Sequence, residues 1–297
     1  MGGMHRQSRK RRLMALYRHL FRHFGPQHWW PARSRFEVIV GAILTQNTAW
    51  TNVERAIARM RTERMLNPGR IDAAPQGTLA RLIRSSGYYN MKAKRLKQFT
   101  GFLLTRYGGS LRRMFQTELP KLREELLAIS GIGEETADSI LLYAGDRPIF
   151  VVDAYTRRVL ERHGLIPDGA RYRQIQRLFM DHLPADAALF NEYHALLVAV
   201  GKTYCRKTPR CEACPLRYDL PASGSAASFI LPKSAGTLPV QEASIARRGL
   251  RRRPRRTSSS TSQGVRRGPA TPLGEVNWTG TVFSGGPRAS YSLLRRR

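Results

Sequence analysis

The stretch Leu-Leu-Ala-Ile-Ser-Gly-Ile-Gly-Glu-Glu-Thr-Ala-Asp, residues 126–138, joins two helical patterns through Gly131-Ile132-Gly133. Glycines let the backbone turn sharply and allow its N–H groups to approach another surface closely. Such groups at the start of a helix suit a phosphate oxygen, so Gly131 and Gly133 are candidate DNA contacts, with Ile132 anchoring the turn. A plain tight turn between two helices explains the same pattern.

Asp153 stands about twenty residues further on, after the apolar run Phe150-Val151-Val152 and before another helical pattern. An aspartate at that place is a natural helix N-cap. It is also well placed for chemistry beside a DNA-binding turn, because burial raises a carboxyl pKa while the helix dipole favours the anion. Both interpretations stay open.

Helical periodicity dominates the chain from about Leu13 to His194 and predicts an all-α fold. The apolar stretch at 148–152 is the strongest strand-like segment, and it is short enough to be a buried connector. Apolar residues recur at helical spacing over 13–24, 36–44, 53–60, 96–104, 118–129, 134–144, 154–163, 171–183 and 186–200.

The composition divides the chain at residue 220. Of the formal net charge of +30, residues 221–297 carry 14 Lys and Arg against 2 Asp and Glu, so residues 1–220 are basic by themselves. Ser, Gly, Pro, Thr and Arg dominate after Leu220, which predicts a disordered basic tail, either simply solvated or a non-specific DNA tether. We therefore expect one domain at 1–220 and a tail at 221–297.

The charge favours a polyanionic partner, although an anionic membrane would attract it too. No stretch reaches the roughly 18 apolar residues of a membrane span, and Met1–Arg12 lacks the pattern of a secretory signal. Three cysteines confined to 205–214 do not suggest a disulfide framework and favour a reducing compartment.

Five motifs, which follow one another along the chain in the same order as in the family, resemble the helix-hairpin-helix (HhH-GPD) DNA glycosylases of the endonuclease III superfamily. They are 126–138, Val151-Val152-Asp153, Leu44-Thr45-Gln46-Asn47-Thr48, Gly87–Lys94 and the cysteine cluster, and they cover about residues 13–220. The resemblance implies two helical lobes with a cleft between them, in which a damaged base is flipped out of the duplex and its N-glycosidic bond is cut.

The resemblance also assigns roles to residues. It makes Asp153 the catalytic carboxylate and Gln46 and Asn47 the loop that fills the vacated stack, although a polar helix C-terminus would also explain the pair. It places Lys92 and Lys94 among the DNA-binding residues.

Glu135 is the first departure from the family pattern. Relatives that also nick the strand carry a lysine two residues after the second glycine, where this chain has Glu135. A carboxylate cannot form a Schiff base, so AP lyase activity by that route is not expected. Glu135 is either a surface residue or a pocket residue that accepts from a base donor or faces a cationic base.

The cysteines are the second departure. The family's 4Fe–4S loop has four cysteines, whereas this chain has Cys205, Cys211 and Cys214, with Leu220 at the fourth position. A 4Fe–4S cluster with a non-cysteine fourth ligand, for which Asp219 is the nearest carboxylate, a zinc site and an empty loop remain alternatives. The basic residues between Cys205 and Cys211 resemble the family's phosphate-binding loop.

Trp29, Trp30 and Trp50 are the candidate base pocket, unless they are core residues. With Glu135 and the Gln46-Asn47 loop they resemble the 3-methyladenine DNA glycosylase branch. An electron-poor alkylated purine is attracted to an indole face. Its weakened glycosidic bond suits a site that lacks lysine.

The sequence therefore predicts a monofunctional DNA glycosylase of base-excision repair that acts on an alkylated purine in double-stranded DNA. We expect a cytoplasmic, nucleoid-associated monomer with no membrane partner. Two rival hypotheses are an endonuclease III-type glycosylase and AP lyase for oxidised pyrimidines, and a non-catalytic helix-hairpin-helix module. Asp153 argues against the second, because a carboxylate near phosphates repels them.

Overall fold

The computed structural model describes residues 2–221, with side chains from residue 7 onward. These residues belong to one compact unit, Met1–Ala235, and they contain helices and connecting loops but no strand. The all-α prediction is thus confirmed. The predicted tail at 221–297 lies outside the described residues, apart from Pro221.

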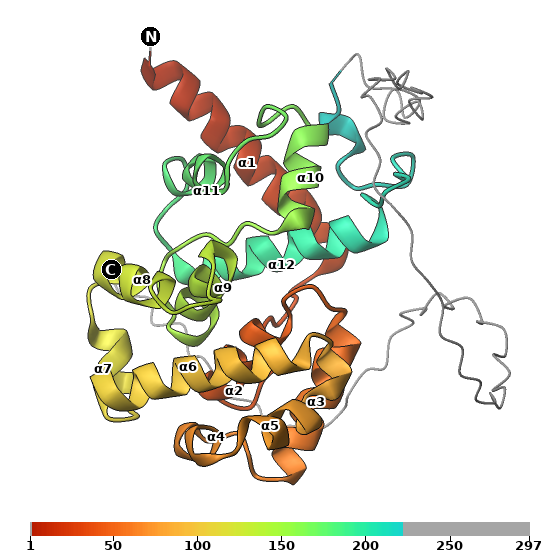
Figure 1. The fold of residues 1–297 in the computed structure, drawn as a ribbon. Helices are drawn as coiled ribbons and strands as arrows, with labels where there is room; N and C mark the ends of the chain where they lie inside the picture. The colour runs from red at the N-terminus through yellow and green to blue at the C-terminus, as the bar shows by residue number, and fades with distance from the viewer. Residues whose placement is uncertain (1, 222–297) are drawn as a thin grey trace, which may run out of the picture. The chain divides into compact units, whose positions relative to one another are not determined.

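The first lobe is built around a long helix, α6, which packs against α2, α4, α5 and α7 (Figure 1). Nine of the ten residues of α2 are buried, which explains its apolar sequence, and Ser34 caps its start by accepting from the Glu37 backbone N–H. The elements are α2 (Arg35–Leu44), α3 (Trp50–Thr62), α4 (Pro68–Ala73), α5 (Gln76–Leu82), η1 (Arg84–Ser86), α6 (Tyr89–Tyr107) and α7 (Leu111–Gln116).

The second lobe is centred on α12, which packs against both α1 and α10. Its N-cap Asp186 accepts from two backbone N–H groups, and Tyr193 fixes α12 to α1 by donating its hydroxyl to the carbonyl of Leu13 at 2.8 Å. The elements are α1 (Gly2–Phe24), α10 (Ala154–Arg162), α11 (Tyr172–Met180), α12 (Ala187–Thr203) and η3 (Arg217–Asp219).

The hairpin lies between the two lobes. It consists of α8 (Leu119–Leu127), a turn and α9 (Glu134–Ser139), and α9 continues into the π-helical turn η2 (Ile140–Ala144). Because η2 packs against α2 and also against α12, this segment joins the lobes. The segment 149–152 that follows is a buried connector, as predicted, and the ring of Phe150 stacks on Phe179 with centroids 3.7 Å apart.

Candidate active site

Asp153 is the N-cap of α10. The backbone N–H of Thr156 donates to its Oδ1 at 2.7 Å, while its Oδ2 lies 3.8 Å from Nε2 of His194. The Asp153 side chain is 13% exposed. The N-cap interpretation and the catalytic one are therefore compatible, because one oxygen caps the helix and the other remains free for chemistry.

His194 and Tyr143 form the wall behind Asp153. His194 comes from α12 and Tyr143 from η2, and the Tyr143 hydroxyl shares a hydrogen bond with Nδ1 of His194. Burial lowers the pKa of His194 and raises that of Tyr143 well above its ordinary value, so both groups are neutral near pH 7. π-helical turns are frequent at functional sites, and this one carries Tyr143 to the site.

Glu135 lies in the first turn of α9 on the side of Asp153. It remains exposed to solvent, yet desolvation by surrounding protein and then the charge of Asp153 raise its pKa to about 7. Glu135 is therefore a site carboxyl that changes charge near neutrality, rather than a remote surface residue.

Lys202, near the C-terminus of α12, supplies a cation to the same site. Its Nζ lies 5.8 Å from the ring centroid of Trp29. Desolvation lowers its pKa, while the charges of Asp153 and Glu54 oppose that shift. Sequence reasoning missed Lys202, His194 and Tyr143, and the available signal was a few polar side chains inside otherwise apolar helical runs.

The three tryptophans contact one another. Ring centroids of Trp29, Trp30 and Trp50 lie 5.2–6.0 Å apart, and Trp30 meets Trp50 edge to face at 82°. Trp30 also packs on Tyr143 at 5.3 Å and against Gly41. Because the rings touch, the candidate base pocket cannot be a slot between two indoles, and a base could stack only on an outer face of the cluster. All three rings remain partly exposed.

The two hairpin glycines have different environments. Gly131 has a φ of +86° and lies against Arg95, whose Nε would be 2.5 Å from an added Cβ. Gly133 has an extended backbone with a φ of −90°, and nothing lies within 4 Å of an added Cβ. Gly131 is therefore required by the turn itself, whereas Gly133 leaves an open surface in front of the N-terminus of α9.

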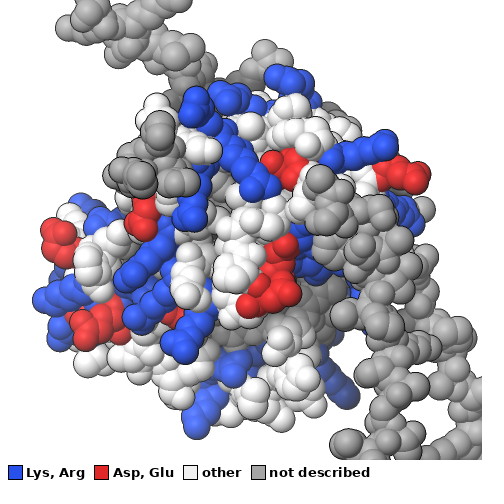
Figure 2. All heavy atoms as spheres, turned by 90° about the horizontal axis from the view of Figure 1, so that it is seen from above, with Lys and Arg blue, Asp and Glu red and all other residues white. Residues whose placement is uncertain are grey.

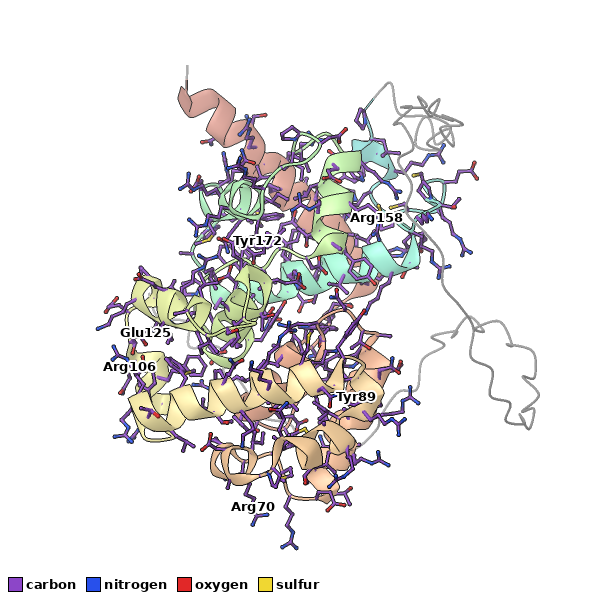
Figure 3. The ribbon with its side chains drawn as sticks, in the orientation of Figure 1. Arg70, Tyr89, Arg106, Glu125, Arg158 and Tyr172 are labelled. Atoms are coloured by element: carbon purple, nitrogen blue, oxygen red, sulfur yellow. The ribbon has the colours of Figure 1, made fainter. Side chains whose placement is uncertain are left out.

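A buried carboxylate anchors the second helix of the hairpin. Asp138 accepts from Arg123 Nε at 2.7 Å, from the Tyr172 hydroxyl at 2.9 Å and from Gln176 Nε2 at 2.7 Å. Figure 3 shows Tyr172 reaching toward α9 from the neighbouring α11. This network fixes the orientation of α9, and with it the direction in which Glu135 points.

The Gln46-Asn47 loop sits against the hairpin. Gln46 Nε2 donates to the carbonyl of Gly131 at 3.0 Å and to Thr136 Oγ1 at 2.9 Å, and its Oε1 accepts from Arg95. Asn47 is exposed and adopts a left-handed backbone with φ 52°. The structure thus brings the loop and the hairpin together, and Asn47 is the side chain that remains free.

The prediction that Lys92 contacts DNA is wrong in this structure. Lys92 is fully buried, and its Nζ donates to the carbonyls of Leu44 at 2.9 Å and Ser86 at 2.6 Å. Desolvation lowers its pKa to about 8. Lys92 ties the end of α2 to the end of η1, whereas Lys94, on the exposed face of α6, is accessible to a phosphate.

The cysteine loop packs against α10. Arg158 donates to the carbonyl of Cys205 at 2.6 Å and to that of Gly201 at 3.1 Å, and Figure 3 shows it between α10 and this loop. The three thiols line an apolar cavity with Val159 and Leu216 among its walls.

Asp219, the carboxylate nearest to the fourth ligand position of the cysteine pattern, is already engaged by other side chains in this structure. Asp219 pairs with Arg12 at 2.8 Å and with His163 at 3.0 Å, so the structure does not show it facing the thiols as a fourth ligand. Within residues 2–221 no three His, Cys, Asp or Glu side chains are arranged to hold a metal ion. Desolvation raises the pKa of Cys214 to about 11, as expected for a neutral thiol.

The surface is strongly basic. Figure 2 shows Lys and Arg in a band across one face, with Asp and Glu in smaller separate groups. None of the described helices is long and apolar enough to cross a membrane.

Comparisons with known proteins agree with this geometry. A family model described as HhH-GPD superfamily base excision DNA repair protein matches residues 40–185. A candidate DNA repair glycosylase of Methanocaldococcus jannaschii, MJ1434, is 49% identical over 68% of this chain and 92% of its own length. Endonuclease III of Sulfolobus acidocaldarius is 30% identical over 62% of this chain and 81% of that protein.

Solved structures show the same fold. The Helicobacter pylori 3-methyladenine DNA glycosylase MagIII, bound to 1,N6-ethenoadenine, superposes with a TM-score of 0.56 and 29% identity, covering 66% of this chain and 97% of that one. An endonuclease III–DNA complex superposes with a TM-score of 0.61 at 23% identity, covering 71% and 94%.

Proposed function

Because the chain belongs to the HhH-GPD superfamily of base-excision DNA repair proteins, we propose that it is a monofunctional DNA glycosylase for an alkylated purine. The observation that carries the proposal is the placement of Asp153. One of its oxygens caps α10 and the other remains free, beside Glu135 and Lys202. A DNA-binding module that only grips its partner has no use for such a carboxylate.

In the proposed reaction the damaged nucleotide leaves the stack and its sugar comes to lie against Asp153. The glycosidic bond breaks heterolytically: its electron pair leaves with the base, and positive charge develops on the sugar. The Asp153 carboxylate stabilises that charge at short range in a site partly shielded from water. A water molecule then completes the hydrolysis at the anomeric carbon.

The absence of a hairpin amine supports single-function chemistry. Glu135 occupies the place at which a Schiff-base lysine would be needed, and a carboxyl group cannot form that bond. Borohydride should therefore trap no covalent protein–DNA adduct. Efficient trapping would assign lyase chemistry to another amine, with Lys202 as the first to be replaced.

Two features support an alkylated purine as the substrate. The outer faces of the tryptophan cluster attract an electron-poor or cationic ring, and Glu135 and Asp153 place negative charge in the same site. MagIII, a 3-methyladenine glycosylase, shares 29% of its residues with this chain. A monomer on double-stranded DNA, located on the nucleoid in the cytoplasm, completes the proposal.

The deciding experiment is a panel of duplexes, each with one lesion, incubated with excess protein and analysed for released base and abasic sites. The panel includes 3-methyladenine, 1,N6-ethenoadenine, thymine glycol, uracil and 8-oxoguanine. We expect release of alkylated purine and little release of thymine glycol. Strong thymine glycol release without alkylpurine release would instead favour the endonuclease III-type alternative. The 30% identity to endonuclease III of Sulfolobus acidocaldarius is the reason for including that lesion.

Asp153→Asn tests the catalytic assignment. Asparagine caps a helix as well as aspartate does, so the variant should fold. We expect base release to fall by orders of magnitude, with equal or higher duplex affinity because a negative charge near DNA is removed. Full excision activity in the variant would show that Asp153 is not the catalytic group.

Trp30→Ala and Trp50→Ala test the base pocket. Stacking of a base on an aromatic side chain contributes about 1–3 kcal/mol, so loss of the stacking ring should slow alkylpurine release roughly tenfold or more. Circular dichroism melts separate this result from the core interpretation, under which both variants lose stability and no selective loss of excision is seen.

A further inference from the structure

A buried histidine stands directly behind the catalytic carboxylate. His194 is 5% exposed, and its ring carries two nitrogens in different situations. Nδ1 shares a hydrogen bond with the Tyr143 hydroxyl, whereas Nε2 is buried, has no hydrogen-bond partner in the described part of the chain and lies 3.8 Å from Asp153 Oδ2. A buried polar atom without a partner carries an energetic penalty, so this arrangement calls for an explanation.

The Tyr143 hydroxyl decides which nitrogen of His194 carries the proton. If Nδ1 held the proton and donated it to Tyr143, the tyrosine hydrogen would need an acceptor, and among residues 2–221 none other than His194 lies within reach. The bare Nε2 lone pair would then also face the Asp153 carboxylate. With Tyr143 donating to Nδ1, both of those groups are satisfied, and the proton sits on Nε2, 3.8 Å from Asp153 Oδ2.

We propose that His194, oriented by Tyr143, is a positioning residue. Its Nε2–H group donates a hydrogen bond to Asp153 Oδ2 when the site closes on a flipped nucleotide. The proposal rests on the glycosylase function above and deepens it. The 3.8 Å separation is too long for a hydrogen bond, and catalytic hydrogen bonds are often long in free enzymes and tighten on substrate binding. The bond would fix the direction of the free oxygen while Thr156 holds the other oxygen.

The electrostatic surroundings favour a neutral donor at this place. Desolvation lowers the pKa of His194, Asp153 opposes that shift from the start of α10, and Lys202 reinforces it from α12 itself. Tyr143 stays protonated because burial and the charges of Asp153 and Glu135 raise its pKa. A neutral imidazole can orient the Asp153 anion without cancelling the charge that stabilises the sugar cation.

The kinetic test compares His194→Leu, His194→Gln and Tyr143→Phe with the wild type on the lesion that the wild type releases fastest. A hydrogen bond to a charged group is worth about 1.5–3 kcal/mol, so His194→Leu should slow single-turnover release roughly ten- to hundredfold with unchanged duplex affinity. His194→Gln, which retains an N–H donor, should recover much of the rate. His182→Leu, which replaces a histidine in the turn after α11, is the matched control.

The pH–rate profile separates positioning from mere packing. Loss of the donor should move the acid limb of the profile to higher pH in His194→Leu, because the anionic form of the carboxylate is no longer stabilised by that hydrogen bond. Equal impairment of the Leu and Gln variants with an unmoved profile would overturn the proposal, and so would a wild-type rate in a folded His194→Leu.

A second measurement works without any activity. Nitrogen-15 NMR of the histidine rings in the free, full-length protein should show His194 as the neutral Nε2–H tautomer, with a shift that changes in Asp153→Asn. A dominant Nδ1–H or doubly protonated ring would overturn the proposal even if the Leu variant fails to fold. If no lesion is excised by the wild type, the proposed function fails, while this measurement still decides which tautomer His194 adopts beside Asp153.

Discussion

At the scale of single residues, the surroundings of a side chain within the site determine its proton affinity. Glu135 shows this most clearly: it is solvent-exposed, yet the protein around it and the nearby Asp153 raise its pKa to about 7. A carboxyl group in that range can accept a hydrogen bond from a base donor when ionised and donate one when protonated. Glu135 therefore makes the site sensitive to pH near neutrality.

The raised pKa of Glu135 predicts how stability changes with pH. Between pH 4.5 and 7 the folded protein binds more protons at Glu135 than the unfolded chain does, so this group's contribution to the free energy of unfolding falls as pH rises through that window. Glu135→Gln removes the titration. We expect the variant to gain stability relative to the wild type between pH 5 and pH 8, measured by urea unfolding at both values.

The control for that measurement is Glu134→Gln, one residue away, whose carboxylate pairs with Arg173 at 2.9 Å. That variant should not gain stability with rising pH. A difference between Glu135→Gln and the wild type that stays constant from pH 5 to pH 8 would contradict the assigned proton affinity of Glu135.

Two lysines on one helix should separate stability from DNA binding. Lys92→Met leaves two buried carbonyls without their donor, so it should lower the free energy of unfolding by about 1–3 kcal/mol. Lys94→Met should leave stability unchanged and weaken duplex binding with a reduced salt dependence. Urea unfolding measures stability and fluorescence anisotropy measures duplex binding. Loss of stability in Lys94→Met together with loss of binding alone in Lys92→Met would contradict the two assignments.

The residues that sequence could identify are those with a motif around them. Asp153 and the hairpin glycines stand at fixed places in a known pattern, and Glu135 is conspicuous because it replaces an expected lysine. His194, Tyr143 and Lys202 sit inside helical runs without any motif, and their meeting at Asp153 depends on how α12 packs on η2 and α10. For Lys92 the motif misled the prediction: a lysine in a basic motif is expected at the surface, whereas Lys92 is buried.

At the scale of elements, we expect the two glycines of the hairpin to have different roles: Gly131 in folding stability and Gly133 in DNA binding. Gly131→Ala forces a side chain onto a backbone with φ +86° and into Arg95, so we expect a loss of at least about 1 kcal/mol of folding stability. Gly133→Ala has room and an ordinary φ, so it should fold normally. The added methyl group would instead stand in front of the backbone N–H groups and weaken duplex binding by about tenfold.

Thermal melts and binding isotherms of the two glycine variants form a matched pair. The expected pattern is instability without a specific binding defect for Gly131→Ala, and a binding defect without instability for Gly133→Ala. Wild-type affinity in Gly133→Ala would show that no phosphate approaches the N-terminus of α9.

The cysteine loop is an element whose role a metal assay can establish. Asp219 is occupied by Arg12 and His163, so we expect protein purified without oxygen to contain less than stoichiometric iron, sulfide and zinc. Near-stoichiometric four-iron content would contradict this and show that a non-cysteine ligand completes a cluster. Cys211→Ser should then lose both the metal and stability, whereas in a metal-free loop it should change little.

Element prediction succeeded where apolar periodicity is long and failed where it is short. The long runs correspond to α2, α6, α10 and α12, whereas α4, α5 and α7 were not foreseen. Each of these three has six or seven residues, too few for a helical period to stand out. Their ends are set by local signals, such as the Asn67 side chain that accepts from the Arg70 N–H.

At the scale of the whole molecule, the excess of positive charge extends beyond the residues that the structure describes. Residues 236–297 contain 13 Arg and 2 Glu, and they follow the compact unit that ends at Ala235. We expect a chain ending at Ala235 to release base at the rate of the full chain under single-turnover saturation. Its duplex affinity should be lower, with a salt slope smaller by about 0.9 for each phosphate that the arginines of 236–297 neutralise in the full chain.

Anisotropy titrations from 50 to 200 mM salt measure that slope for both chains. A control of unchanged length is the full chain with five arginines, Arg251, Arg252, Arg253, Arg255 and Arg256, replaced by serine. Identical slopes in all three proteins would show that the C-terminal charges do not contribute to DNA binding.

The hydrogen bonds that hold Gln46 in place have a consequence for how the protein would search DNA. Gln46 is tied to Gly131, Thr136 and Arg95 before any duplex is present, so the loop carrying Asn47 is preset rather than assembled on contact. A preset wedge can probe each base pair during sliding without waiting for a loop to rearrange. If the chain acts as the proposed glycosylase, the dwell time at an undamaged pair is governed by how readily that pair opens, and the lesion is selected by the weakness of its own stacking and pairing.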